Sequence, residues 1–204
     1  GISIGILIMG GGTLLTTRSI PSEDNVISSN TMSNGGITLN NPGTTRTIVT
    51  KNTIKNGNIG ISLGWGASNN WIYHNNFIDN KIVHVRIDAT YGTVVNVWDD
   101  GYPSGGNYWS DYTGVDYFSG PYQNETGSDG IGDAPYVIDA NNIDHYPLMS
   151  AVIHDVAVLS VVPSATEVYV GQVVNVTVTV QNQGNFTETF PVTCKYVLEG
   201  VEHT

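Results

Sequence analysis

The residues best suited to chemistry in this chain are the acidic ones in and around a glycine-rich stretch, GSDGIGDAPY at residues 127–136. Asp129 and Asp133 are separated by glycines that let the backbone wrap tightly, and Glu125 and Asp116 lie upstream. Hard cations such as Ca²⁺ take several carboxylate and carbonyl oxygens as ligands. These four acidic residues therefore predict a calcium site. The alternative that the sequence leaves open is a plain loop in which the aspartates only support turns.

A second chemistry is glycoside cleavage, which needs two carboxyl groups that flank one bond. Asp99 and Asp100 are adjacent, so on a strand their side chains would point to opposite faces. Basic residues that could serve a lyase are sparse, and Arg86 is the only one on a predicted strand after Lys55. No catalytic set is spelled out, so we expect no enzyme activity and assign no catalytic residue.

Three aromatic residues, Trp65, Trp71 and Tyr73, are candidates for stacking on sugar rings. Aromatic side chains combine a large apolar face with a polar edge, which suits the faces of a saccharide. The competing interpretation is that they cover the flank of the fold. A groove lined by acids beside Trp65 and Trp71 would favour glycan binding, and a bare flank would favour a structural role.

The elements that must position these residues are indicated by a threefold repeat in the first half of the chain. The segment NVISSNTMSN (25–34) returns as TIVTKNTIKN (47–56) and as WIYHNNFIDN (71–80), and GITL (36–39) returns as GISL (60–63) and HVRI (84–87). A period in the low twenties with short alternating strands is typical of a stacked β-solenoid. We therefore predict a right-handed parallel β-helix over residues 1–98.

Aligned in this way, the copies share columns of residues that should stack from coil to coil. One apolar column contains Val26, Ile48 and Ile72, another contains Met32, Ile54 and Ile78, and the asparagine columns are Asn30, Asn52, Asn76 and Asn34, Asn56, Asn80. The asparagines should lie where the strands bend, because Asn tolerates left-handed backbone. His74, His84 and Arg86 alternate with apolar neighbours and are expected on an outward, solvated face.

The composition limits the partners and the location of the protein. Only 12% of the 204 residues are charged, and the formal net charge of −11 argues against nucleic acid or anionic membranes as partners. No apolar run is long enough to span a membrane, and the chain is expected to begin inside a solenoid. Cys194 is the only cysteine and is expected to be a buried strand residue. Sequons at Asn124, Asn175 and Asn185 indicate an extracellular, glycosylated protein.

Residues 99–149 are rich in aromatics, glycine and aspartate, and show no repeat. The order WDDGYPSGGNYWSDY, GSDGIGDAPYVI and NNIDHYPLM resembles the terminal segment of NosD-like β-helix proteins, especially large archaeal surface proteins. The resemblance covers about residues 25–149 and implies a right-handed β-helix of the carbohydrate-binding and sugar-hydrolase type, outside the cytoplasm. Because a solenoid needs its open end covered, residues 99–149 are expected to form a C-terminal cap.

Residues 150–204 alternate polar and apolar residues with a period of two, as in the run from Val173 to Val180. This segment is similar to the start of the immunoglobulin-like adhesion module called CARDB. A complete sandwich of this kind needs about seven strands and about 100 residues, so we expect a partial module. Its missing strands would come from chain beyond Thr204 or from another chain by β-strand addition.

NosD is also the name of a periplasmic factor for copper-site assembly, so copper handling is a further alternative. Cu(I) prefers clustered Met and Cys, and Cu(II) prefers clustered His. The three methionines and five histidines are scattered without short ligand spacing. The resemblance is therefore taken to carry the fold and not the metal.

These observations together predict an extracellular, non-catalytic cell-surface protein that is stabilised by Ca²⁺ and assembles with itself or with neighbouring surface proteins. A surface layer, a stalk or a filament would be its setting. The alternative from a different functional class is a β-helix that binds or cleaves glycans. Fold analogy alone does not decide between them.

Overall fold

The structure is a computed structural model that describes residues 6–9, 22–41, 43–169, 171–193, 196–198 and 201–203. It divides into two compact units, residues 1–152 and 153–204, and each is described by itself. The described residues form strands, turns and bends without a helix, which confirms the predicted all-β class. Accordingly, no helix in this part of the chain has the length and hydrophobicity that crossing a membrane requires. Cys194 lies outside the described residues.

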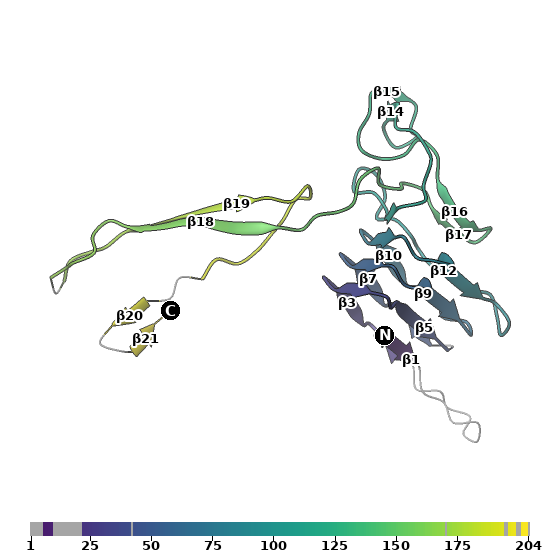
Figure 1. Ribbon diagram of the computed structural model, residues 1–204, viewed down its shortest axis with the longest axis horizontal. Coiled ribbons are helices and arrows are strands. Elements are labelled where there is room, and N and C mark those ends of the chain that lie inside the picture. Colours follow the sequence, from purple (N-terminus) through teal and green to yellow (C-terminus); the bar gives the residue numbers. More distant parts are fainter. Residues whose placement is uncertain are drawn as a thin grey trace, which may run out of the picture. The chain divides into compact units, whose positions relative to one another are not determined.

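Unit 1 is built from parallel sheets whose strands come from successive coils (Figure 1). The first sheet contains β1 (Ile6–Met9), β5 (Ile37–Asn40), β9 (Ile59–Gly64) and β12 (Val83–Asp88). The second contains β3 (Val26–Ser28), β7 (Ile48–Thr50) and β10 (Trp71–Tyr73), and the third contains β4 (Thr31–Ser33), β8 (Thr53–Lys55), β11 (Asn76–Ile78) and β13 (Tyr108–Trp109). A short pair joins β2 (Ser22–Glu23) to β6 (Thr44–Thr45). The predicted parallel solenoid is confirmed.

The register of the third coil differs from the sequence alignment by one residue. Ile48 of β7 pairs with Trp71 rather than Ile72, and Ile54 of β8 pairs with Phe77 rather than Ile78. Asn76 consequently lies beside Thr53, so its predicted place in the column of Asn30 and Asn52 is wrong. The segment HNNF carries two adjacent asparagines, and either one satisfies the repeat when only the letters are compared.

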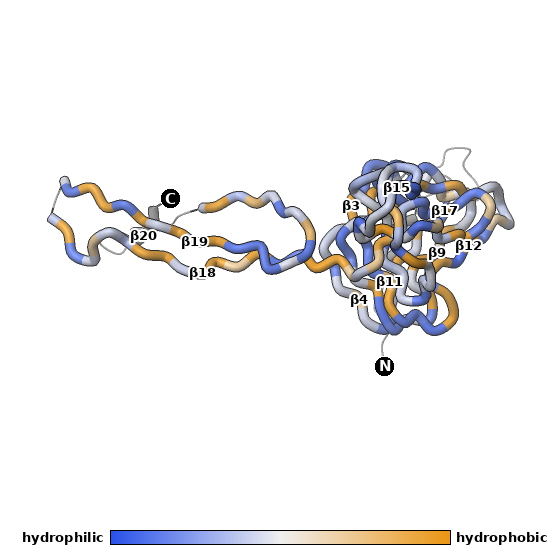
Figure 2. The backbone as a smooth tube through the Cα atoms, turned by 90° about the horizontal axis from the view of Figure 1, so that it is seen from above, coloured by the Kyte–Doolittle hydropathy of each residue, from blue (hydrophilic) through white to orange (hydrophobic). Residues whose placement is uncertain are grey.

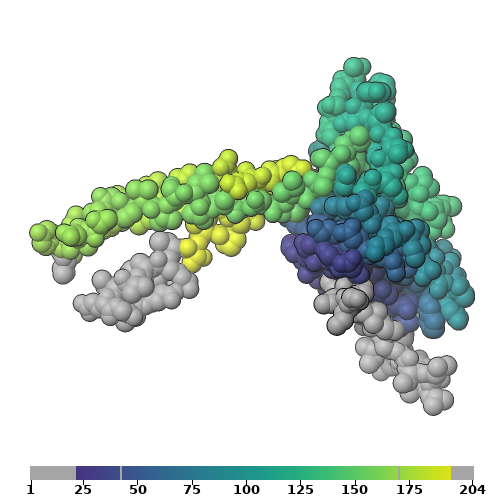
Figure 3. Space-filling model, viewed as in Figure 1, coloured from purple at the N-terminus to yellow at the C-terminus, as the bar shows by residue number. Residues whose placement is uncertain are grey.

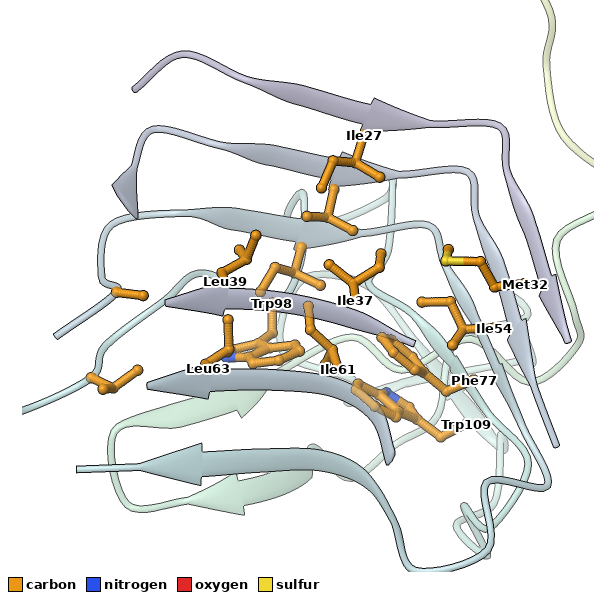
Figure 4. Packing of buried hydrophobic residues seen from close by; sticks show 14 residues of the cluster. Ile27, Met32, Ile37, Leu39, Ile54, Ile61, Leu63, Phe77, Trp98 and Trp109 are labelled. Atoms are coloured by element: carbon orange, nitrogen blue, oxygen red, sulfur yellow. The ribbon is translucent and has the colours of Figure 1, made fainter. Parts of the chain in front are cut away.

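Apolar residues from all three sheets point into the coil interior and stack on like residues above and below. Figure 4 shows Trp98 among isoleucine and leucine side chains inside the coils, and a second row in which Met32, Ile54, Phe77 and Trp109 follow one another from coil to coil. Ile61, Leu63, Ile72 and Phe77 are completely buried. Burial at roughly 25 cal/mol per Å² of apolar surface makes this column the main source of stability.

The corners of the coils recur at residues with left-handed backbone. Ser29, Lys51 and His74 have φ of 58°, 60° and 54°, and Asn34, Asn56 and Asp79 have φ of 62°, 57° and 48°. The expectation that asparagines mark the bends is therefore confirmed for Asn34 and Asn56. Other residue types accept the same conformation at a cost of about 1 kcal/mol each, because the stacked coil fixes it.

A ladder of buried asparagine side chains runs through the interior beside the corner at Ser29, Lys51 and His74. The Oδ1 atom of Asn52 accepts hydrogen bonds from the backbone N–H and the amide of Asn30, both at 3.0 Å. Asn75 does the same for Asn52, at 3.1 and 2.9 Å, and Asn107 does the same for Asn75, at 3.1 and 3.0 Å. Each amide oxygen thus accepts the backbone and side-chain N–H groups of the asparagine in the coil before it, so these polar groups are hydrogen-bonded, as burial requires.

A second ladder follows another corner and has the same logic. The backbone N–H of Thr47 donates to Asn70 Oδ1 at 3.0 Å, and Asn70 donates from its backbone and amide to Asn96 Oδ1, both at 2.9 Å. Asn96 in turn donates to Asn142 Oδ1 at 3.0 Å. Position 47 holds a threonine where the other coils hold asparagine, and its hydroxyl accepts from the Asn25 amide at 3.5 Å.

One hairpin ends both ladders. It consists of β16 (Tyr136–Asp139) and β17 (Asn142–Asp144), which pair antiparallel. The Oδ2 atom of Asp144 accepts hydrogen bonds from the Asn107 backbone at 2.7 Å and the Trp109 indole at 2.9 Å. Asn142 Oδ1 accepts the Trp98 indole at 3.1 Å as well as Asn96. Alternate residues of one strand therefore close the two ladders.

The rest of the predicted cap covers the end of the apolar core. Trp109 lies between Phe77 and Tyr136, with ring centroids 4.5 and 4.3 Å apart and nearly parallel planes. Beyond it, β14 (Phe118–Ser119) and β15 (Glu125–Thr126) form a small antiparallel pair. In Figure 3 the teal cap residues stand on the end of the blue coils. Because β13 pairs with β11, the fourth coil continues past residue 98.

Unit 2 contains two antiparallel pairs among its described residues. β18 (Val156–Pro163) pairs with β19 (Val176–Asn182), with a bulge between Val158 and Ser160, and β20 (Tyr196–Leu198) pairs with β21 (Val201–His203). Figure 2 shows hydrophobic residues in orange along both β18 and β19. These pairs do not by themselves make two facing sheets, so the immunoglobulin-like assignment stays a prediction.

Candidate functional site

A groove of about 550 Å³ lies on the outer face of the first sheet. Pockets that hold small molecules span roughly 300–1,000 Å³, so this groove is large enough for a ligand. Its walls come from three successive coils and from the turn after β12. Its lining consists of Thr38, Asn40, Ser62, Gly64, Trp65, Arg86, Ile87, Asp88, Ala89 and Thr90.

The floor of the groove is set by the register of β5, β9 and β12. One row across the sheet is Thr38, Ser62 and Arg86, and the next is Asn40, Gly64 and Asp88. Side chains that are two residues apart on a strand share a face, so both rows point outward together. At Gly64 an added Cβ would lie 3.2 Å from Asn40 Oδ1 and 3.3 Å from Asp88 Cβ. Glycine at this position therefore lets the side chains of Asn40 and Asp88 approach closely from the two neighbouring strands.

One aromatic residue, Trp65, lines the groove and packs against a second, Tyr91. Trp65 follows β9 in a left-handed conformation, with φ of 55°, and its side chain is 42% exposed. Its ring centroid lies 4.3 Å from that of Tyr91, with the planes tilted by 42°. Tyr91 is supplied by the turn after β12, and sequence reasoning missed it. The pair gives the groove an apolar face beside its polar rows.

Asp88, the acidic residue of the groove, is hydrogen-bonded within its own turn. Asp88 Oδ1 accepts hydrogen bonds from the Thr90 backbone at 3.0 Å and the Thr90 hydroxyl at 2.5 Å. These bonds lower the pKa of the Asp88 carboxyl, and the nearby Arg86 charge adds to the effect. Asp88 is therefore ionised at neutral pH and brings a negative charge to the groove lining.

The predicted stacking residues do not lie together. Trp71 and Tyr73 belong to β10 in the second sheet, whereas Trp65 follows β9 in the first. Tyr73 packs edge-on against His74, with centroids 5.0 Å apart, and burial raises the pKa of its hydroxyl. Of the three candidates, Trp65 alone lines the groove, together with an acidic residue.

The expectation that His74 and His84 face solvent is wrong, because both are buried, at 7% and 5% exposure. His74 Nε2 lies 2.9 Å from the Ser104 carbonyl. His84 Nδ1 lies 3.1 Å from the Asn80 amide nitrogen, and its Nε2 lies 3.3 Å from Asp111 Oδ1. Desolvation lowers the pKa of His84, opposed by the charge of Asp111. Strand alternation failed for His74 because that residue lies at a coil corner with left-handed backbone. His84 lies within β12, and its ring is near the buried rings of Phe77 and Trp109, with centroids 6.2 and 6.1 Å away.

The acidic loop predicted to bind calcium is held by its own hydrogen bonds. Asp116 accepts from the backbone N–H groups of Asp129 and Gly130, at 3.1 and 2.9 Å. Asp133 accepts from those of Tyr117 and Phe118, both at 3.0 Å. The two carboxylates thus join the loop around residues 116–118 to the loop around residues 129–133. The Asp129 carboxylate also accepts from the backbone N–H of Ile131, at 3.0 Å.

Glu125 lies on β15 in the same cap, with its carboxylate exposed. Within the described ranges, no three His, Cys, Asp or Glu side chains are grouped so that they could hold a metal ion. The aspartate oxygens satisfy backbone donors in the conformation shown, so calcium binding stays a prediction that would need further oxygens from the loop.

The three sequons lie in exposed segments. Asn124 precedes β15, and Asn175 precedes β19, where its backbone carbonyl accepts from Ser164 at 2.7 Å. Asn185 Oδ1 accepts from the Ile153 backbone at 2.7 Å, so its amide already helps to hold a turn of unit 2. Glycosylation of all three stays a prediction.

Unit 1 is thus a capped solenoid of parallel coils with a polar groove that Trp65 also lines. Residues 15–114 match the family model described as periplasmic copper-binding protein (NosD). This part of the chain is therefore similar to NosD-like β-helix proteins, which supports a periplasmic or cell-surface β-helix protein. Neither the curated proteins nor the solved structures contain a match.

The family description names copper, and the described residues can be compared with that chemistry. Met32 is buried in the core at 7% exposure, and the described histidines lie apart with partners of their own. His145 Nδ1 contacts Asp99 Oδ2 at 2.9 Å, and His154 contacts Glu188 in unit 2. The described donor set therefore does not fit a copper centre, and copper handling stays an alternative carried by the family description.

Proposed function

We propose that the chain is a non-catalytic structural and adhesive part of an extracellular cell-surface protein, in which unit 2 joins neighbouring chains by strand addition. The observation that carries the proposal is the apolar surface of the β18–β19 ribbon. Val161 and Val162 are adjacent in β18 and are 59% and 55% exposed. Adjacent strand residues point to opposite faces, so the ribbon presents valine on both.

Such a ribbon needs further strands. A single two-stranded hairpin is at best marginally stable in water, and three or more strands or a packed face are needed for independent stability. Exposed strand edges with apolar faces also pair readily with another chain. Additional strands from a neighbouring surface protein or a second copy would complete a sandwich of the CARDB type. The capped solenoid would then act as a stiff spacer in a surface layer, stalk or filament.

Replacing Val161 and Val162 together by lysine tests this proposal. We expect the wild-type chain to form multimers whose mass in light scattering rises with concentration. The double variant should stay monomeric, because it loses the apolar surface that a neighbouring strand would cover, whereas Thr177→Lys should still form multimers. Thr177→Lys on the paired strand is the matched control, since it adds charge without removing an apolar contact. A wild-type chain that is monomeric at every concentration would contradict self-assembly.

A second candidate, glycan binding, is favoured by the groove on the first sheet. It combines a partly exposed indole, an amide, hydroxyls and two charges in about 550 Å³. Saccharides are bound through apolar stacking on one face and hydrogen bonds to hydroxyls, and these groups supply both. Adhesion to a glycan coat and a structural role are compatible in one surface protein.

Trp65→Ala tests the second candidate. In calorimetric titrations with surface polysaccharides, we expect the Kd to weaken by about tenfold, the effect of losing roughly 1.4 kcal/mol of stacking. Trp71→Ala removes an indole of similar exposure from the second sheet and should leave the Kd unchanged. Equal losses in both variants, or binding unaffected by either, would place the glycan elsewhere or remove it from the function.

A further inference from the structure

Arg86 is the residue of the groove whose role is not accounted for by the fold. Its side chain is exposed on β12, and it makes no salt bridge with any residue that the structure describes. Arg46 provides the contrast, because its guanidinium is held by Glu23 and by Asp24, with Nε 2.7 Å from Asp24 Oδ1. An arginine that merely fastens neighbouring coils would be expected to resemble Arg46.

The surroundings of Arg86 leave its charge available to a ligand. Asp88, two residues further on the same face, directs one oxygen to Thr90, and the Arg86 charge is the smallest of the influences on its pKa. Ser62 and Thr38 continue the row of Arg86 with short, neutral side chains. A guanidinium presents a planar fork of donors that matches a carboxylate in two parallel hydrogen bonds.

The rest of the groove fits a sugar ring attached to that carboxylate. Trp65, which packs against Tyr91, offers an apolar face in the groove lining. Asn40 and Asp88 line the groove on either side of Gly64, and an amide and a carboxylate can donate to and accept from ring hydroxyls. These groups recognise a polar ring with one apolar face, and Arg86 adds recognition of a negative charge.

We infer that the groove binds a saccharide that carries a carboxylate, with Arg86 pairing the charge and Trp65 stacking on the ring. This inference rests on the proposed glycan-binding function. The net charge of −11 does not prevent it, because interactions between exposed charges are screened beyond about 8 Å at physiological ionic strength. The Arg86 guanidinium therefore acts on a ligand in the groove more strongly than the acidic residues outside the groove do.

The test compares a short oligogalacturonate with its methyl ester, which has the same rings without the charge. By calorimetry, we expect the wild-type chain to bind the acid at least about tenfold more tightly than the ester, since hydrogen bonds to charged groups contribute about 1.5–3 kcal/mol. Arg86→Gln should bind both ligands with the Kd of the ester. Lys81→Gln removes another exposed cation away from the groove and should keep the preference.

Each outcome of this test is informative. Equal binding of acid and ester by the wild type, unchanged in Arg86→Gln, overturns the inference and leaves glycan binding intact. Binding of neither ligand by the wild type overturns the inference, and the Trp65→Ala titrations with surface polysaccharides then decide on glycan binding separately. Added NaCl should weaken acid binding by the wild type and not by Arg86→Gln, which distinguishes charge pairing from a change of shape.

Discussion

Asp144→Ala should lower the free energy of unfolding of unit 1 by about 4 kcal/mol. The substitution leaves three donors without an acceptor in the interior: the backbone N–H groups of Asn107 and Tyr146 and the indole N–H of Trp109. Each buried donor left unsatisfied costs about 1–3 kcal/mol. Urea unfolding followed by tryptophan fluorescence measures the loss, because all four tryptophans belong to unit 1.

The control for this prediction is Asp100→Ala. Asp100 is an exposed carboxylate that accepts one hydrogen bond, from Ser104 Oγ at 2.8 Å. Its removal should cost less than about 1 kcal/mol. If Asp144→Ala were no more destabilising than Asp100→Ala, the hairpin would not be closing the asparagine ladder.

The same residue makes stability depend on pH. Burial raises the pKa of Asp144 to about 7, against the opposing hydrogen bonds from Asn107, Trp109 and Tyr146. The folded chain therefore binds this proton more tightly than the unfolded chain, in which the pKa is near 3.8. Its contribution to stability is complete below the unfolded pKa and is lost as pH rises toward 7. Asp144→Asn should remove this component from the pH profile.

Gly60→Ala should destabilise unit 1 by about 3 kcal/mol, because overpacking against fixed backbone cannot be relieved by side-chain rotation. The added Cβ would lie 2.6 Å from the His84 carbonyl oxygen and 3.0 Å from Phe77 Cδ1. These atoms belong to the next coil, so the coils would have to move apart. The midpoint of urea unfolding reports the effect.

Ser62→Ala is the matched control for Gly60→Ala, since it lies on the outer face of the same strand and adds no atoms. It should change the free energy of unfolding by no more than about 0.5 kcal/mol. A Gly60→Ala variant as stable as Ser62→Ala would show that the coil spacing tolerates a methyl group at this column.

The solenoid was predictable from sequence because its evidence is repeated. Every coil contributes another sample of the same apolar and asparagine columns, and a short strand that is ambiguous alone becomes clear in register with its neighbours. The prediction was wrong by one residue at Asn75 and Asn76, where both letters satisfy the pattern. Only the pairing of Asn76 with Thr53 distinguishes them.

The residues of the groove could have been predicted from the sequence, whereas the contact of Asp144 with the asparagine ladder could not. Asn40, Gly64 and Asp88 are spaced by the repeat itself, so reading the outward columns as well as the inward ones would have brought them together. By contrast, Asp144 lies 37 residues from Asn107 in a segment without repeats. No spacing rule links a hairpin residue to the last amide of a ladder, because that contact depends on how the cap folds over the coils.

The hydrogen bonds of the asparagine ladder all run in one direction, from each coil to the next, and Asp144 accepts the last of them. Asn52 and Asn75 each accept from the coil before and donate to the coil after, whereas Asp144 accepts from Asn107 and donates to no further coil. The number of coils before Asp144 can therefore change while the same hairpin still ends the ladder. Each duplicated coil would lengthen the solenoid by one strand spacing, about 4.8 Å. The number of coils therefore sets the length of the solenoid, and evolution or design can change it while keeping the same cap.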